Sequence, residues 1–92
     1  MRLRFTLPAA DDLDGILTYI EAHSPTGARR VQRRLQSVLA VLLQHPQAGQ
    51  LTRRPGMRRI VVTPYPYLVF YRVTGDEIVI HGGRHAARKP LG

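Results

Sequence analysis

The chain has 92 residues, 43% of them hydrophobic, which predicts a single small domain over residues 1–92 with one apolar core. It has no cysteine, no apolar run near the ~18–20 residues that cross a bilayer, and no signal-peptide pattern. These absences exclude disulfides and thiolate metal sites, and they indicate a cytoplasmic protein without a membrane partner. Lys and Arg number 14 against 6 acidic residues, so the net charge is +8, and we expect the surface to face a polyanion, either nucleic acid or an acidic protein.

The chain is expected to begin with a strand and a helix. Residues 2–7 alternate polar and apolar side chains, which is typical of a half-buried strand, and Pro8 then opens a helix. Residues 13–20 of that helix carry apolar side chains at i, i+3, i+4 and i+7. Three aspartates are expected in its first turns, where the helix dipole favours anions, and Gly15 is a candidate for close packing.

A second helix is predicted from Ser24 to about Gln44. Ser24 is the expected N-cap, and Pro25 suits the first helical position. The link between the two helices is only a few residues long, which favours an antiparallel hairpin. The apolar face of this helix is expected to consist of Val31, Leu35, Val38, Leu39 and Leu42.

The remaining sequence predicts a loop and three strands. Residues 45–56 are expected to be irregular, and strand-like runs follow at 57–63, 67–73 and 77–81. The middle run is apolar at both odd-numbered and even-numbered positions, which is typical of a central strand buried on both faces. Gly82-Gly83 is expected to end the last strand and to leave residues 84–92 as a basic C-terminal tail.

This order of elements predicts an α+β fold. It is a two-layer sandwich with an N-terminal strand, an antiparallel helical hairpin and then a three-stranded antiparallel meander (β-α-α-β-β-β). Two helices cover one face of such a sheet, so the other face needs a partner or a folded-back tail. Parity alone does not decide whether Arg59 and Val61, or Arg58 and Ile60, point away from the helices.

Four stretches of sequence carry a resemblance to a known family. They are Ala10-Asp11-Asp12-Leu13-Asp14-Gly15-Ile16 before Tyr19-Ile20, Ser24-Pro25 before Ala28-Arg29-Arg30-Val31, Leu42-Leu43-Gln44-His45-Pro46 before Gly49, and the block from Arg58-Arg59-Ile60 through Tyr65-Pro66-Tyr67 to Arg84-His85-Ala86-Ala87-Arg88. In this order and at this spacing, the chain resembles the RelE/ParE superfamily of toxins from bacterial type II toxin–antitoxin systems. The fold of that superfamily is the sandwich predicted above.

The resemblance implies one of two activities. RelE-like members are ribonucleases that cut mRNA in the ribosomal A site, and ParE-like members poison DNA gyrase without being enzymes. This chain has no lysine in its central loop or strands and no tyrosine after Arg84, and its His85-x-x-Arg88 pattern looks ParE-like. We therefore expect a ParE-like toxin that arrests growth by poisoning DNA gyrase; the alternative is a metal-independent mRNA endonuclease that acts with the ribosome.

Under the ribonuclease alternative, attack by the RNA 2′-OH needs a general base, a general acid and cations around the phosphate. His81 is a further candidate for proton transfer in that reaction, but its spacing from His85 on a strand does not favour a metal pair. No metal or cofactor is expected. The candidates for the ribonuclease site are Arg59, Arg72, Arg84, His85 and Arg88.

The resemblance also implies a cognate antitoxin. We expect a ParD-like protein whose acidic, amphipathic tail binds the uncovered sheet face and pairs its carboxylates with Arg58, Arg59 or Arg72. The arginines of the second helix are either a solvated face or a patch for that antitoxin. The residues expected to bind the target or the antitoxin are Arg53, Arg54, Arg58, Arg59, Tyr65, Arg72, Arg84, His85 and Arg88.

Overall fold

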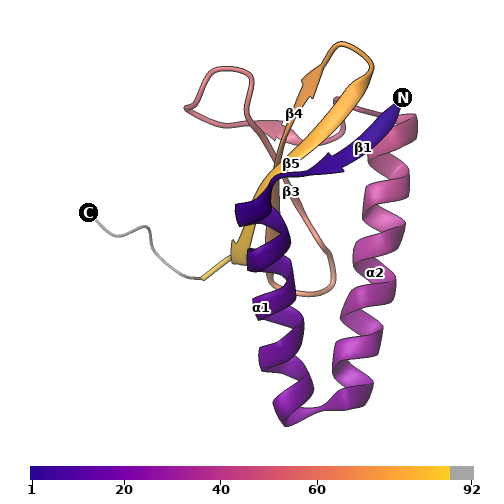
Figure 1. The fold of residues 1–92 in the computed structure, drawn as a ribbon, viewed down its shortest axis with the longest axis vertical. Coiled ribbons are helices and arrows are strands. Elements are labelled where there is room, and N and C mark those ends of the chain that lie inside the picture. The colour runs from indigo at the N-terminus through magenta and orange to yellow at the C-terminus, as the bar shows by residue number, and fades with distance from the viewer. Residues whose placement is uncertain (88–92) are drawn as a thin grey trace.

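The computed structural model describes residues 1–87, which form a five-stranded sheet and a helical hairpin (Figure 1). The strand order is β1-β5-β4-β3-β2; β1 runs parallel to β5, and the other neighbours are antiparallel. The expected α+β order of strand, helical hairpin and three-stranded meander is confirmed. In chain order the elements are β1 (Arg2–Phe5), α1 (Leu7–His23), α2 (Pro25–Gln44), β2 (Gln50–Leu51), β3 (Arg58–Val61), β4 (Tyr67–Thr74) and β5 (Glu77–His85).

Side-chain caps set the first residue of both helices. Thr6 Oγ1 accepts a hydrogen bond from the backbone N–H of Ala9 (3.2 Å), so α1 begins directly after Thr6 and the strand expected over residues 2–7 ends earlier. The three aspartates consequently lie beyond the first turn of α1, and the prediction that they interact with the helix dipole there is wrong. Ser24 Oγ accepts from the N–H of Gly27 (2.9 Å), which confirms the expected N-cap of α2.

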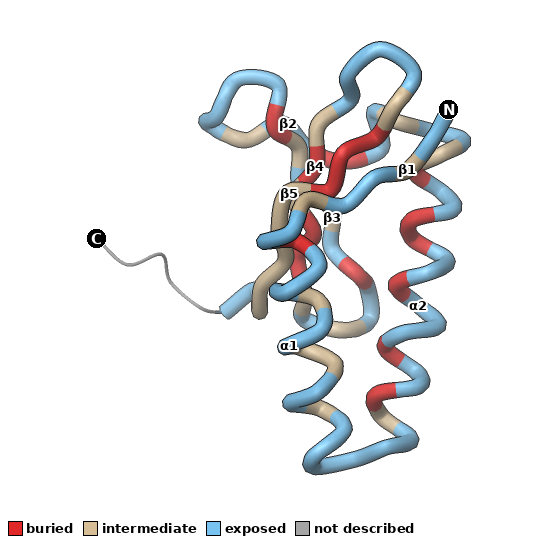
Figure 2. Tube along the Cα trace, in the orientation of Figure 1, coloured by how far each residue is buried: buried red, intermediate tan, exposed pale blue. Residues whose placement is uncertain are grey.

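The core lies between the hairpin and one face of the sheet (Figure 2). The five residues expected on the apolar face of α2 are all buried, whereas the apolar residues of α1 between positions 13 and 20 are half-buried. No atom outside the helix backbone would contact a Cβ added at Gly15, so the expected close packing there is wrong. The sheet and the segment that follows β3 contribute Val62, Val69, Tyr71, Ile78 and Ile80 to this core.

Strand β4 lies in the middle of the sheet, as predicted, but one further strand was missed. The two residues of β2 pair antiparallel with β3, inside the stretch 45–56 that the sequence assigned to an irregular loop. A strand of two residues is too short to show a period-two pattern. The β3–β4 connection contains a cis peptide bond between Thr63 and Pro64.

Strand β5 continues past the position where the sequence predicts its end. Gly82 and Gly83 both pair with β4, so the prediction that they break the strand is wrong. A Cβ at Gly83 would lie 2.8 Å from Leu13 Cδ2 of α1, and the Gly83 N–H donates to Asp12 Oδ2 (3.1 Å). The glycines therefore allow α1 to approach the strand closely.

The longer β5 changes the position of the residues expected in the basic tail. Arg84 and His85 lie within the strand, and a bulge shifts its register, because Tyr71 pairs with Ile80 whereas the preceding residue of β4 pairs with Gly82. The residue that has no partner at this bulge is His81. Residues 88–92 of the expected tail, Arg88 among them, lie outside the described residues.

Candidate functional site

The pairing register divides the strand residues between two faces of the sheet. Ile60 and Val69 are direct partners and both pack in or against the core under the hairpin. Alternation therefore directs Arg59 and Val61 to the opposite side, which we call the open face. By the same register, the open face is formed by Arg2 and Arg4 of β1, Arg59 and Val61 of β3, Leu68, Phe70 and Arg72 of β4, and Glu77, Val79 and Arg84 of β5.

The loop between β2 and β3, residues 52–57, lies over part of the open face. Arg72 donates from Nε and Nη2 to the carbonyl oxygen of Pro55 (both 3.4 Å), and Met57 at the end of the loop is buried. The sequence predicted a bare face, and this covering by the chain's own loop corrects it. The loop does not seal the face, since Val61 remains 46% exposed.

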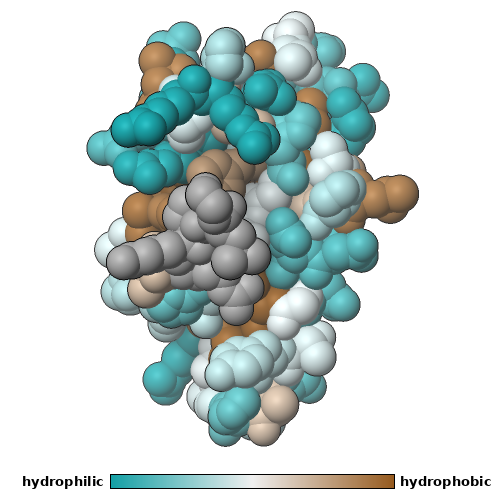
Figure 3. Space-filling view, turned by 90° about the vertical axis from the view of Figure 1, so that its left-hand side faces the viewer, coloured by the Kyte–Doolittle hydropathy of each residue, from teal (hydrophilic) through white to brown (hydrophobic). Residues whose placement is uncertain are grey.

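A groove of about 500 Å³ lies between this loop and strands β4 and β5. No acidic side chain lines it within residues 1–87, and the Arg84 guanidinium lies 5.3 Å from the centre of the Phe70 ring, a cation–π geometry. On the side of the molecule shown in Figure 3, a hydrophilic band crosses the upper part, and hydrophobic residues border it. The groove therefore suits a segment that is both apolar and acidic. Its lining residues are Thr52, Arg53, Arg54, Met57, Phe70, His81, Gly82 and Arg84.

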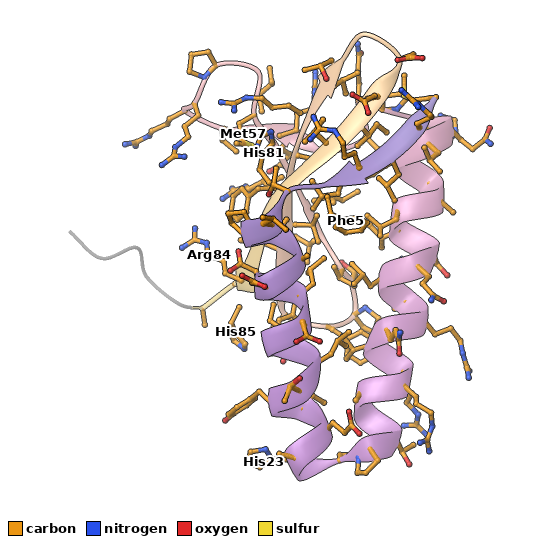
Figure 4. All side chains as sticks on the ribbon, in the orientation of Figure 1. Phe5, His23, Met57, His81, Arg84 and His85 are labelled. Atoms are coloured by element: carbon orange, nitrogen blue, oxygen red, sulfur yellow. The ribbon has the colours of Figure 1, made fainter. Side chains whose placement is uncertain are left out.

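His81 is the histidine that lines this groove (Figure 4). Burial lowers its pKa below the usual histidine value, and the positive charges of Arg72 and Arg4 lower it further. The imidazole is therefore neutral at neutral pH. An anion bound nearby would offset the arginine charges and favour its protonation.

His85 lies on the other side of the sheet from the arginines. It pairs with Tyr67, and the two rings form an edge contact with centroids 5.4 Å apart. The N–H of Ala87 donates to His85 Nδ1 (3.1 Å). Figure 4 shows Arg84 and His85, which are consecutive in β5, projecting in different directions. The structure therefore brings Arg59, Arg72 and Arg84 to one face and directs His85 to the opposite one.

Arg58 holds the chain between α2 and β2. Its Nη1 donates to the carbonyl oxygens of Gly49 (2.7 Å) and Gln47 (3.4 Å). Next to it, the buried Tyr71 hydroxyl donates to Pro46 O and accepts from the Gly49 N–H (both 2.8 Å). This anchoring role of Arg58 was not predicted, because it depends on carbonyl groups of a loop whose path no sequence pattern shows.

The nine predicted binding residues are thus not one cluster. Tyr65 lies in the β3–β4 turn beside arginines of α2, away from the groove. Arg2 and Arg4 lie on the open face, with ion pairs to Glu77, but were not predicted to do so, since the parallel pairing of β1 with β5 could not be read from the chain. Five of the predicted residues lie on or beside the open face: Arg53, Arg54, Arg59, Arg72 and Arg84.

Two classes of site are not present in the part of the chain that the structure describes. Between residues 1 and 87, no three His, Cys, Asp or Glu side chains form a group that could hold a metal ion. Neither α1 nor α2 is long and apolar enough to cross a membrane.

Comparison with known proteins assigns the family. The model of the ParE toxin of type II toxin–antitoxin systems, parDE, matches residues 3–90. The chain belongs to the ParE toxin family. It is also 36% identical over 79 residues to Y4kP of Sinorhizobium fredii, a protein that is named as a toxin; the match covers 86% of this chain and 82% of that protein.

Solved structures agree with this membership. The chromosomal ParDE toxin–antitoxin system from P. aeruginosa is similar with a TM-score of 0.82 and 28% identity, covering 92% of this chain and 95% of that chain. The isolated E. coli RelE toxin has the same fold at a TM-score of 0.68 and 19% identity, covering 95% and 85% of the two chains. This ParE family member is the toxin of a type II toxin–antitoxin system, a class in which the toxin has an antitoxin as its partner.

Proposed function

We propose that this ParE family member arrests growth by binding DNA gyrase and trapping its cleaved complex with DNA, without catalysing a reaction itself. The observation that carries the proposal is the match of residues 3–90 to the ParE toxin family, and the separation of Arg84 from His85 on opposite faces of the sheet supports it. Cleavage of RNA needs an acid, a base and cations around one phosphate. Arginines bind an anionic surface but supply no proton transfer at neutral pH, so His81 is the histidine beside them that a ribonuclease reaction would have to use.

The gyrase proposal is tested by adding the purified protein to gyrase and supercoiled plasmid. We expect linear DNA with gyrase covalently attached to accumulate with toxin concentration, and to appear only after denaturant and protease treatment. His85→Gln, which changes no arginine, is expected to leave this signal unchanged. Plasmid that stays supercoiled at every toxin concentration, with growth arrest still present in cells, contradicts the proposal.

One observation favours the ribonuclease alternative. His81 has a lowered pKa and lies in a groove with Arg84, so it could accept a proton from a 2′-OH beside a bound phosphate. This alternative predicts new mRNA 5′ ends at the A-site codon in a translation reaction. His81→Gln would remove those ends, whereas it would leave gyrase poisoning intact.

The antitoxin is proposed to dock on the open face through an acidic, amphipathic segment. Apolar side chains of that segment would pack on Phe70 and Val61, and its carboxylates would pair with Arg59 and with the loop arginines Arg53 and Arg54. Such pairing is expected to weaken as salt rises. Arg53→Gln/Arg54→Gln should dissociate from the antitoxin at lower salt than wild type, and Arg29→Gln/Arg30→Gln on α2 is the control of equal charge. If both variants behave like the wild type, the antitoxin docks elsewhere.

A further inference from the structure

The outer side of α2 and the β3–β4 turn together form a second basic site, which we call the α2 patch. It is a shallow hollow of about 270 Å³ lined by three arginines, a serine, a proline and a tyrosine. The guanidinium of Arg34 donates from Nε to the carbonyl oxygen of Thr63, which holds it beside the turn. Figure 1 shows this turn beside α2. The residues of the α2 patch are Arg30, Arg33, Arg34, Ser37, Pro64 and Tyr65.

The arginines of the α2 patch have no neutralising partner in the described part of the chain. Between residues 1 and 87, neither Arg30 nor Arg33 nor Arg34 forms an ion pair, whereas Glu77 pairs with arginines of β1 on the open face. The chain carries a net charge of +8, so this cationic site attracts anions over a distance. Guanidinium and tyrosine hydroxyl groups are among the side chains that bind phosphodiester oxygens, whereas Ser37 Oγ donates to the carbonyl oxygen of Arg33 (3.2 Å).

The residues of the α2 patch favour binding of a duplex backbone over binding of unstacked bases. Arg30 and Arg34 are four residues apart, about 6 Å along the helix axis, so they lie on one side of α2 where both can contact neighbouring phosphates of one strand. Sites for single strands stack successive bases on several aromatic rings. The α2 patch has one aromatic residue, Tyr65.

We propose that the α2 patch binds duplex DNA through its phosphodiester backbone, without reading the base sequence. The choice of DNA over RNA rests on the proposed function, since gyrase acts on duplex DNA and the patch would hold the toxin against DNA at its target. The patch lies on the helical layer, behind the open face, so a segment docked on the open face leaves it accessible.

The test measures binding of a short fluorescent DNA duplex by anisotropy, with gyrase absent, between about 50 and 200 mM salt. Arg30→Gln/Arg33→Gln removes two exposed arginines from the patch, and Arg2→Gln/Arg4→Gln removes the same charge from β1. Each phosphate contact contributes about −0.9 to the slope of log K against log salt, so the patch variant should lose about 1.8 from that slope. We expect its affinity to fall about tenfold for every duplex sequence.

The control variant should change the slope by much less, because Arg2 and Arg4 are already paired with Glu77. Tyr65→Phe, which removes one hydroxyl and no charge, should weaken binding without changing the slope. Equal losses in the two arginine variants would mean that net charge alone binds DNA, and this overturns the proposal.

Binding measurements with two other polyanions distinguish them from DNA. Tighter binding of an RNA duplex of the same sequence, or of a polyglutamate peptide, through the same arginines would also overturn the proposal. Because gyrase is absent, loss of gyrase poisoning with DNA binding retained would count against the proposed function and not against the α2 patch.

Discussion

The hydroxyl of Tyr71 joins β4 to the segment that follows α2. It is fully buried, donates to Pro46 O and accepts from the Gly49 N–H. Tyr71→Phe leaves a buried N–H and a partly buried carbonyl without this partner, and we expect it to lower the free energy of unfolding by about 1–3 kcal/mol. Urea denaturation followed by circular dichroism measures the loss.

The matched control for this prediction is Tyr19→Phe. Tyr19 is 68% exposed, so loss of its hydroxyl strands no buried group and should change stability by less than about 0.5 kcal/mol. Equal effects in the two variants would show that the hydrogen bonds of Tyr71 contribute nothing beyond those of a solvated phenol.

His81 makes stability depend on pH. Its pKa in the folded protein is lowered by burial and by Arg72 and Arg4, whereas the unfolded chain has the usual value near 6.5. Between these two pKa values the unfolded state binds more protons, so the free energy of unfolding rises with pH up to about 6.5 and falls on acidification. His81→Gln should reduce that acid-induced loss in urea titrations across this range.

A second variant checks the cause of this shift. Arg4→Gln removes a positive neighbour of His81 and should raise its pKa towards the usual value, so the pH dependence should shrink but not vanish. A histidine NMR titration follows the imidazole directly. Unchanged pH dependence in both variants would remove His81 as its source.

At the residue scale, the sequence named arginines expected to bind a partner but did not show where each one lies in the fold. The alternation of residues in the sequence did not decide which face of the sheet Arg59 lies on. Its neighbour Ile60 packs against the core, so Arg59 lies on the open face. Arg58 was predicted to contact a partner but donates to carbonyls of its own chain. Such roles depend on contacts between residues far apart in sequence, and the periodicity of polar and apolar residues does not show these contacts.

The elements were predictable where their patterns are long. The apolar stripe of α2 and its N-cap identified that helix correctly, because a helix repeats its spacing over several turns. The predicted end of β5 was wrong. A Gly-Gly pair interrupts most strands, but here Gly82 and Gly83 pair with β4 and α1 packs against them. The glycine pattern was visible, while the helix that explains it was not.

Two glycines in different elements allow a prediction about backbone conformation. Gly15 lies inside α1 and Gly75 in the β4–β5 turn, and a Cβ at either would meet open space. Gly15→Ala should stabilise the protein by about 0.5–1 kcal/mol, because alanine loses less backbone entropy in a helix. Gly75 has φ +57°, so Gly75→Ala should destabilise by about 1 kcal/mol.

Thermal unfolding measures both changes, and each kcal/mol corresponds to about 4–8 °C in Tm for a domain of this size. The pair serves as its own control, since the same atoms are added in equally open places. A loss of stability at Gly15 would mean that α1 has a packing contact at that position.

The whole molecule carries its arginines on two layers. The sheet layer presents Arg53, Arg54 and Arg84 around a partly apolar groove, and the helical layer presents the polar α2 patch. The sequence predicted the sandwich and an excess of positive charge, but the side predicted to be uncovered is partly covered by the loop of residues 52–57. It did not predict that Tyr65 lies with the helix arginines, because this requires the β3–β4 turn to reach α2.

Two separate layers predict two independent binding events. Substitutions more than about 7–10 Å apart without shared partners usually act additively. In a protein with Arg53→Gln/Arg54→Gln and Arg30→Gln/Arg33→Gln combined, the salt at which the antitoxin dissociates should therefore equal that of the loop variant alone. The DNA salt slope should equal that of the α2 variant alone. Titrating each ligand against the wild type, both double variants and the combined protein measures this. A change in DNA slope caused by the loop arginines, or a change in antitoxin release caused by the α2 arginines, would show that one partner spans both layers.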